Sequence, residues 1–245
     1  MRVIRNILLR LLGLRLYLQL VSKLYIYCVS RGFWKSKYPE LFYLDSVLSS
    51  GDTCIDIGAN LGYYSTRMLR LVGKNGHVYA VEPIPLFGEI WKKNVQPHKN
   101  PHVQLFPFAL GKDSGTVQMG IPEKNGRIHH GMTKIASSAQ EKYVRFFDVE
   151  MRNPDELFAD LTDLHFIKCD VEGYESVVFE NMQKTINRFR PLVQSELGGQ
   201  ENRMKVISLF NDMQYDCAVL HNNSLEKIST DKAMTLSQDF YFIPR

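Results

Sequence analysis

From Gly51 onward the sequence alternates short apolar runs with amphipathic stretches, and this alternation restricts the chain to few folds. It is typical of a parallel sheet covered by helices on both faces. We therefore predict an α/β fold with a doubly wound, seven-stranded, mostly parallel sheet. The predicted strands are Thr53–Ile57, His77–Glu82, Val103–Ala109, His165–Asp170, Leu192–Ser195, Asp216–Leu220 and Asp239–Ile243. The predicted helices are Tyr64–Val72, Leu86–Val95, Glu175–Phe179, Met182–Phe189 and Glu201–Met213.

The chain length of 245 residues suits one large domain. We expect residues 1–37 to form an N-terminal basic apolar helix and residues 38–245 to form the domain. An insertion at residues 112–153, rich in glycine, is expected to be a lid or a substrate loop. The polar stretch Asn222–Lys232 contains no convincing helix, so the last two strands are expected to pair antiparallel.

The first 37 residues carry eight Lys and Arg and no acidic residue, whereas the rest of the chain holds 22 basic and 26 acidic residues. Apolar residues from Val3 to Tyr25 recur every three or four positions, but charges interrupt every window long enough to span a membrane. No signal-peptide cleavage site follows. Three alternatives stay open for residues 1–34: a helix lying on an anionic membrane surface, a helix packed on its own domain, or a contact with a second subunit.

Four well-separated cysteines without a C-x-x-C pair favour a reducing compartment. We therefore expect a cytoplasmic protein, peripheral on the cytoplasmic membrane face if the basic helix binds lipid. A nucleic-acid partner is not expected, because the body of the chain is acidic.

The run Asp56-Ile-Gly58-Ala-Asn60-Leu-Gly62 directly follows a predicted strand and precedes a predicted helix. The glycines allow a tight turn close to a ligand, and the helix N-terminus offers free N–H groups. The pattern lacks the third glycine of dinucleotide-binding loops. Asp56 would repel a pyrophosphate but could bind the ammonium group of S-adenosylmethionine. A plain strand-to-helix turn is the alternative.

The second predicted strand ends in Glu82-Pro83, where a carboxylate can accept hydrogen bonds from both ribose hydroxyls. Tyr64 and Ser65, at the start of the helix after the glycine loop, complete the predicted cofactor site on this side.

Two further runs, Pro107-Phe-Ala-Leu-Gly111 and Phe166-Ile-Lys-Cys-Asp-Val-Glu-Gly-Tyr-Glu175, complete a set that resembles the FkbM family of methyltransferases over roughly residues 50 to 200. The resemblance implies a class I methyltransferase fold, S-adenosylmethionine as donor, and an oxygen of a sugar, polyketide or similar natural product as acceptor. The chain departs from the family pattern at Phe147–Leu157, where Asp148-Val-Glu150-Met-Arg152 replaces the usual T-L-D run.

The resemblance also implies roles for individual residues. Asp56, Gly58, Asn60 and Gly62 would face the methionine part of the donor, Glu82 the ribose, Ala109 the adenine edge, and Asp170 the region beside the methyl group.

Methyl transfer requires the acceptor oxygen to be held in line with the donor, and a base if the acceptor is an alcohol. Asp170 and Glu172 are the catalytic candidates on the strand side, with Glu175 and Glu196 nearby, and His130 is the candidate in the insertion. The carboxylates could instead bind a divalent cation, but a metal-free site is favoured.

The sequence therefore predicts an O-methyltransferase acting on a small molecule or a lipid-linked glycan, as a monomer or an oligomer. The alternatives are a nicotinamide-dependent oxidoreductase, a methyltransferase of RNA or protein, and a catalytically silent membrane-tethered scaffold.

Overall fold

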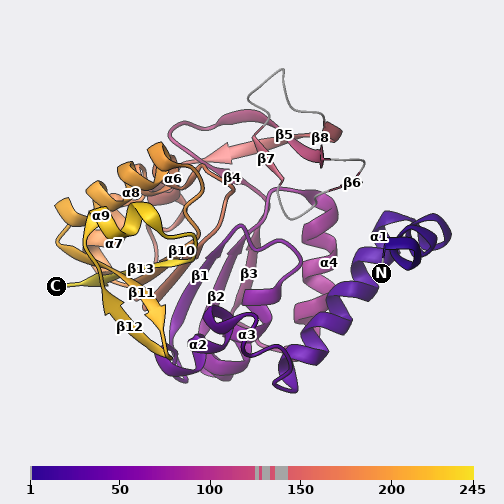
Figure 1. The fold of residues 1–245 in the computed structure, drawn as a ribbon, viewed down its shortest axis with the longest axis horizontal. Helices are drawn as coiled ribbons and strands as arrows, with labels where there is room; N and C mark the ends of the chain where they lie inside the picture. The colour runs from indigo at the N-terminus through magenta and orange to yellow at the C-terminus, as the bar shows by residue number, and fades with distance from the viewer. Residues whose placement is uncertain (1, 125–126, 129–132, 136–142) are drawn as a thin grey trace.

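A central sheet of eight strands forms the middle of the molecule in the computed structural model, which describes residues 2–124, 127–128, 133–135 and 143–245 (Figure 1). In spatial order the strands are β12 (Ser224–Lys227), β11 (Tyr215–His221), β13 (Phe240–Pro244), β10 (Leu192–Ser195), β9 (Phe166–Cys169), β1 (Thr53–Ile57), β2 (His77–Val81) and β3 (Val103–Phe106). The five strands from β10 to β3 run parallel, and β13 is antiparallel to both of its neighbours. The doubly wound, mostly parallel sheet is confirmed, with one strand more than predicted.

Helices cover both faces of this sheet, because the apolar residues of its central strands point to alternate sides. Ile55 and Ile57 pack in the core beneath α6, α7 and α8, whereas Cys54 packs beneath α2, α3 and α4. The helices are α2 (Pro39–Val47), α3 (Tyr63–Val72), α4 (Pro85–Val95), α5 (Pro154–Leu157), α6 (Glu175–Glu180), α7 (Gln183–Phe189), α8 (Gln200–Asp212) and α9 (Thr230–Thr235), with short 3-10 turns at Gly73–Asn75 and Gln96–His98.

The polar stretch after β11 contains a strand and the start of a helix that the sequence analysis does not predict. Asn222 and Asn223 both adopt a left-handed conformation, with φ of 49° and 62°, which makes the tight turn from β11 into β12. The Ser229 side chain accepts a hydrogen bond from the N–H of Lys232 and begins α9. The predicted antiparallel pairing of β11 with β13 is present.

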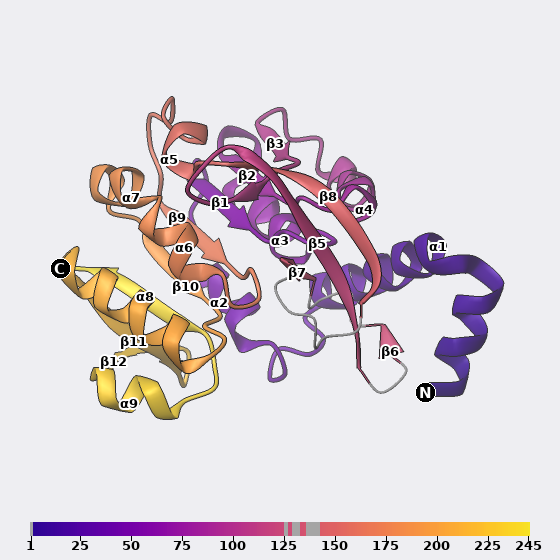
Figure 2. The ribbon, with the colours of Figure 1, turned by 90° about the horizontal axis from the view of Figure 1, so that it is seen from above.

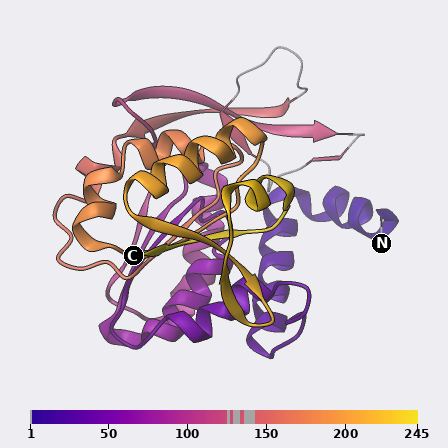
Figure 3. The same ribbon diagram turned by 60° about the vertical axis from the view of Figure 1, so that its left-hand side comes forward.

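The insertion forms a second, mainly antiparallel sheet where a loop was expected. Its strands are β4 (Ala109–Leu110), β8 (Tyr143–Arg152), β5 (Gly115–Lys124) and β6 (Arg127–Ile128), with β7 (Lys134–Ile135) also paired to β5. It lies above the central sheet in the view of Figure 3. The third predicted strand is divided at Pro107, which has no N–H to donate, and the part after it joins this second sheet.

The N-terminal helix α1 (Arg2–Ser30) is broken at Gly13, whose φ of 69° and ψ of 167° are not helical. Figure 2 shows the chain turning sharply at the break. After it, Leu18 packs against α4, and Tyr25 and Val29 join the core beneath α2 and α3. Of the three alternatives for the N-terminal helix, packing on its own domain therefore applies to one face of the half that follows Gly13. Among the helices described, none combines the length and the apolarity needed to cross a membrane.

Candidate active site

The loop between β1 and α3 lies at the carboxyl edge of the central sheet, where open α/β sheets hold ligands. The N–H groups of Gly58 and Ala59 both donate to the carbonyl of Val81 at 3.0 Å, which fixes the loop against the end of β2. Gly58, Asn60 and Gly62 all have positive φ values. The two glycines are therefore needed for the path of the chain as well as for closeness to a ligand.

Glu82 is held at the end of β2 by two backbone donors. Its Oε2 accepts the N–H of Asn60 and its Oε1 accepts the N–H of Ile84, both at 2.8 Å. The side chain is 5% exposed, and this burial raises its pKa to about 7 against the pull of the two N–H groups. Each oxygen keeps acceptor capacity for a further donor.

Asp56 is fully buried at the end of β1, under the glycine loop. Its Oδ2 accepts a hydrogen bond from the Ser65 hydroxyl, which itself accepts from the Trp91 indole at 2.8 Å. Oδ1 has no hydrogen-bond partner within the described part of the chain. Burial raises the pKa of Asp56, while the nearby Lys168 and Ser65 lower it. An unsatisfied buried carboxylate oxygen is costly, and it marks a place for a donor group of a ligand.

Polar side chains form a row across four neighbouring strands on the face covered by α2 and α3. Asp56, Lys168, Gln194 and Tyr241 lie abreast in the strand register, and each is at most 5% exposed. In a doubly wound sheet such positions are normally apolar. The row therefore indicates a functional site.

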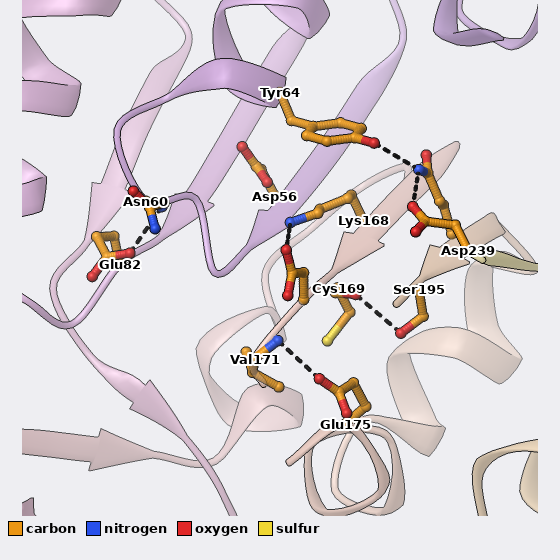
Figure 4. A network of polar contacts seen from close by, with 12 residues as sticks. Asp56, Asn60, Tyr64, Glu82, Lys168, Cys169, Val171, Glu175, Ser195 and Asp239 are labelled. Carbon is orange, nitrogen blue, oxygen red and sulfur yellow. Dashed lines mark hydrogen bonds and ion pairs between the residues drawn. The ribbon is translucent and has the colours of Figure 1, made fainter. Parts of the chain in front are cut away.

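Lys168 supplies the positive charge of this row (Figure 4). Its Nζ lies 3.1 Å from Oδ2 of Asp170 and 5.0 Å from the centre of the Tyr64 ring. Asp170 and Asp56 together raise the pKa of Lys168 in spite of its burial, so the ammonium stays charged. Lys168 thus balances part of the negative charge around it.

Gln194 connects the row to two other elements. Its Nε2 donates to the Tyr64 hydroxyl at 2.9 Å and to Oδ2 of Asp239 at 2.7 Å. Burial raises the pKa of Asp239 to about 6. This contact brings the residue before β13 into the site, although it is far away in the sequence.

Two hollows meet at the loop. One is mainly apolar, with about 670 Å³ of empty space that includes its opening to solvent. The other is polar and aromatic. Gly58, Asn60 and Asp170 line both hollows. The first hollow is lined in addition by Glu82, Pro83, Phe87, Phe108, Ala109 and Glu172, and the second by Tyr38, Glu40, Asp56, Tyr64, Lys168, Glu196 and Asp239.

The segment after β9 is shaped by Glu175. Its Oε1 accepts the N–H groups of Val171 and Gly173 at 2.9 and 3.1 Å, and its Oε2 accepts from Asn202 at 2.6 Å. Glu175 therefore holds the loop rather than facing the hollows. The loop places Glu172 in a left-handed conformation, with φ of 57°, at the wall of the apolar hollow.

The side-chain carboxyl groups of Glu172 and Glu196 both have raised pKa values. Burial, with Asp170 as the next contribution, raises the pKa of each carboxyl to about 7. Groups that titrate near neutral pH are suited to proton transfer.

Most of the predicted site residues line these hollows, but two described ones do not. Ser65 reaches the site through Asp56, and Gly62 faces the ring of Trp91. His130 lies outside the described residues. In the described part of the chain, no group of three or more His, Cys, Asp and Glu side chains is arranged to hold a metal ion.

Tyr38, Glu40 and Asp239 line the polar hollow but were missed by the sequence analysis. Asp239 carried a weak signal, because it is the acid that directly precedes the last apolar run. Tyr38 and Glu40 had no sequence signal that pointed to the site, because their position depends on how α2 packs.

Comparison with known families gives one match that covers most of the chain. The model of the methyltransferase FkbM domain matches residues 56–217. This range contains the glycine loop, Glu82, Asp170 and the whole second sheet.

Curated relatives match shorter segments. A protein-L-isoaspartate O-methyltransferase of Caenorhabditis elegans is 33% identical over 84 residues, which are 34% of this chain and 36% of that protein. One from Methanosarcina mazei is 38% identical over 66 residues, or 26% of this chain and 27% of that protein. The matched part thus spans about a third or less of the length of these two relatives.

Two solved structures share the fold. The FkbM methyltransferase of Methylobacillus flagellatus KT superposes with a TM-score of 0.51 at 13% identity, over 80% of this chain and 44% of that one. A protein described as a putative rRNA methylase from Clostridium thermocellum also superposes with a TM-score of 0.51, at 10% identity, over 83% of this chain and 91% of that one. Identities this low establish the methyltransferase-like α/β fold alone.

Proposed function

The chain belongs to the FkbM family of S-adenosylmethionine-dependent methyltransferases, and we propose that it transfers a methyl group to a hydroxyl of a sugar, a glycolipid or a related natural product. The observation that carries this proposal is the meeting of an apolar and a polar hollow at Asp170, Gly58 and Asn60. One hollow suits the donor and the other suits a hydroxyl-rich acceptor.

The residues present fit S-adenosylmethionine. In the apolar hollow, the remaining lone pairs of Glu82 suit the ribose hydroxyls, and Phe108 and Ala109 suit the adenine ring. Oδ1 of Asn60 at the junction and Oδ1 of Asp56 beside it in the polar hollow have no hydrogen-bond partner among the described residues, and both suit the ammonium group of the methionine part. When bound, the donor supplies an electrophilic methyl group on a sulfonium.

The second sheet contributes to the same wall. Within the proposed domain of residues 38–245, the insertion at 112–153 places Met119 and Ile135 against the apolar hollow. We propose that this insertion closes over the donor and shapes access for the acceptor, as lid segments do.

The chain's own contribution to the reaction is to hold the acceptor hydroxyl at the junction and to receive its proton. Asp170 lines both hollows and is proposed to orient the hydroxyl. Glu172 is proposed as the base that takes the proton at its carboxylate, and His130 remains a proposed second candidate. The positive charge of Lys168 limits the repulsion among these carboxylates. We favour a mechanism without a divalent cation.

A methyltransferase of protein is the second candidate, supported by the matches to protein-L-isoaspartate O-methyltransferases. RNA methylation and a silent scaffold complete the alternatives. The polar hollow favours a glycan, because carboxylates can accept hydrogen bonds from sugar hydroxyls and the rings of Tyr38 and Tyr63 can pack on sugar faces.

The test is transfer of label from methyl-labelled S-adenosylmethionine to fractions of a cell extract, with Asp56→Ala as the control. Label in the glycan or lipid fraction that is lost with the variant is expected. Label in protein or RNA instead would move the function to that alternative. Donor binding without any transfer would favour the silent scaffold.

A further inference from the structure

The half of α1 that follows Gly13 is fixed on the domain by its inner face. Leu18 and Ser22 are fully buried, and the Ser22 hydroxyl accepts a hydrogen bond from Asn94 at 2.9 Å. Arg15 pairs with Glu89 of α4 at 2.7 Å. These contacts set which face of the helix points outward.

The outward face is apolar. Leu16, Leu20, Leu24 and Tyr27 follow one another at spacings of four, four and three residues, directly opposite the buried face, and each is more than half exposed. Phe33 and Trp34, in the turn that follows the helix, are also exposed, at 59% and 42%. We call these six residues the outer face of α1.

This concentration of exposed apolar side chains is local. Among the side chains whose exposure the structure describes, which exclude residues 2–7, seven of the nine exposed large apolar ones lie between Leu11 and Trp34. Isolated exposed leucines are ordinary, but a gathered set on one face marks a surface that contacts a partner.

The charge around the outer face identifies the partner. Residues 1–37 carry eight basic residues and no acid, and Lys23, Arg31, Lys35 and Lys37 are exposed beside the apolar side chains. A symmetric pair of chains would bring the same face against itself and so place these like charges together. Anionic lipid suits both features, because the basic side chains are attracted to its negative surface and the apolar side chains can enter its interface. We propose that the protein docks on an anionic membrane through the outer face of α1.

The outer face adjoins the candidate active site. The Trp34 ring lies 5.4 Å from the ring of Tyr25 and 6.4 Å from that of Tyr38, measured between centroids. Both tyrosines line the polar hollow. Docking would therefore bring this hollow next to the lipid surface, which suits a lipid-anchored acceptor; this consequence rests on the proposed function, whereas the docking does not.

The test measures co-sedimentation of the 245-residue chain with vesicles of phosphatidylcholine alone and with vesicles that contain 30% phosphatidylglycerol. Leu20→Glu/Leu24→Glu is compared with Met204→Glu, a matched control on α8 where the native side chain is 46% exposed. We expect binding only to the anionic vesicles, weakened at least about tenfold by the double variant and unchanged by the control. Thermal unfolding and donor binding, measured in parallel, are expected to be the same for all three proteins.

Several outcomes would overturn the docking. The double variant could bind the vesicles as the native protein does, or the native protein could stay in the supernatant. Sedimentation velocity could also show a dimer that the double variant dissociates, which would assign the outer face to a second copy. None of these outcomes bears on methyl transfer, because the label-transfer test uses a different variant and a different readout.

Discussion

Gly58 lies so close to Asp170 that a Cβ atom on Gly58 would stand 1.9 Å from the carbonyl oxygen of Asp170. The donor loop and the end of β9, more than a hundred residues apart in the sequence, therefore fit together only when position 58 has no side chain. This contact joins the two motifs that line both hollows.

Gly58→Ala is expected to weaken donor binding at least about tenfold, because either the loop or the end of β9 must move. The φ of 76° at Gly58 adds backbone strain to the steric clash. Isothermal titration with S-adenosylmethionine measures the effect. Gly115→Ala is the matched control, since a Cβ there meets nothing within 4 Å. Equal donor affinity in the two variants would contradict the close fit at Gly58.

The central sheet could be predicted because its strands are apolar runs bounded by turn residues. The strands that were missed differ in pattern. In β8, buried Val149 and Met151 alternate with exposed Glu150 and Arg152, so the strand forms no continuous apolar run like those of the central sheet and does not stand out in an insertion rich in glycine. The same holds for β12, of which only Leu225 is partly buried. The sequence signal available for β8 was the alternation of apolar and polar residues at every second position.

Asp56→Asn tests the buried carboxylate at the end of β1. The substitution keeps the size of the side chain and removes the charge that we propose for the ammonium of the donor. A charge-assisted hydrogen bond is worth about 1.5 to 3 kcal/mol, so the donor Kd is expected to rise roughly 10- to 100-fold. Ser65→Ala, which removes the donor to Oδ2 and the acceptor of the Trp91 indole N–H but keeps the charge of Asp56, is expected to have a smaller effect. A Kd unchanged by Asp56→Asn would exclude that role.

The polar row shows which parts of the site were open to prediction. Asp56 and Glu82 were predicted as site residues because each lies at the end of an apolar run. Lys168 and Gln194 are polar residues inside apolar runs. Their meeting follows from register, which places Asp56 beside Lys168 and Lys168 beside Gln194. Asp239 joins them because β13 inserts antiparallel next to β10, and no local pattern specifies that order.

Donor affinity is expected to rise with pH between about 6 and 8. Burial raises the pKa of Glu82 from 4.5 to about 7, so its carboxyl is mostly protonated at pH 6 and mostly ionised at pH 8. The ionised form accepts the ribose hydroxyls better, since the proton of the neutral form occupies one of its acceptor positions. Titrations with S-adenosylmethionine across this range measure the slope. Glu82→Gln is expected to bind more weakly and to flatten the profile, and a slope that persists in this variant would assign the titration to another group.

Variants of Glu172 and Glu196 test which carboxylate is the base of the reaction, because the two have the same raised pKa but line different hollows. Glu172 lines the apolar hollow and Glu196 the polar one, and each has a pKa of about 7. If Glu172 accepts the proton of the acceptor, kcat of the native enzyme increases as pH rises through 7, because only the ionised carboxylate can act. Glu172→Gln should then lower kcat by about 100-fold or more, flatten this profile, and leave the donor Kd nearly unchanged. Glu196→Gln is the matched control and should keep the pH dependence, with its effect confined to KM for the acceptor. The reverse result, a flat profile for Glu196→Gln and a normal one for Glu172→Gln, would place proton transfer in the polar hollow, beside Lys168 and Asp239.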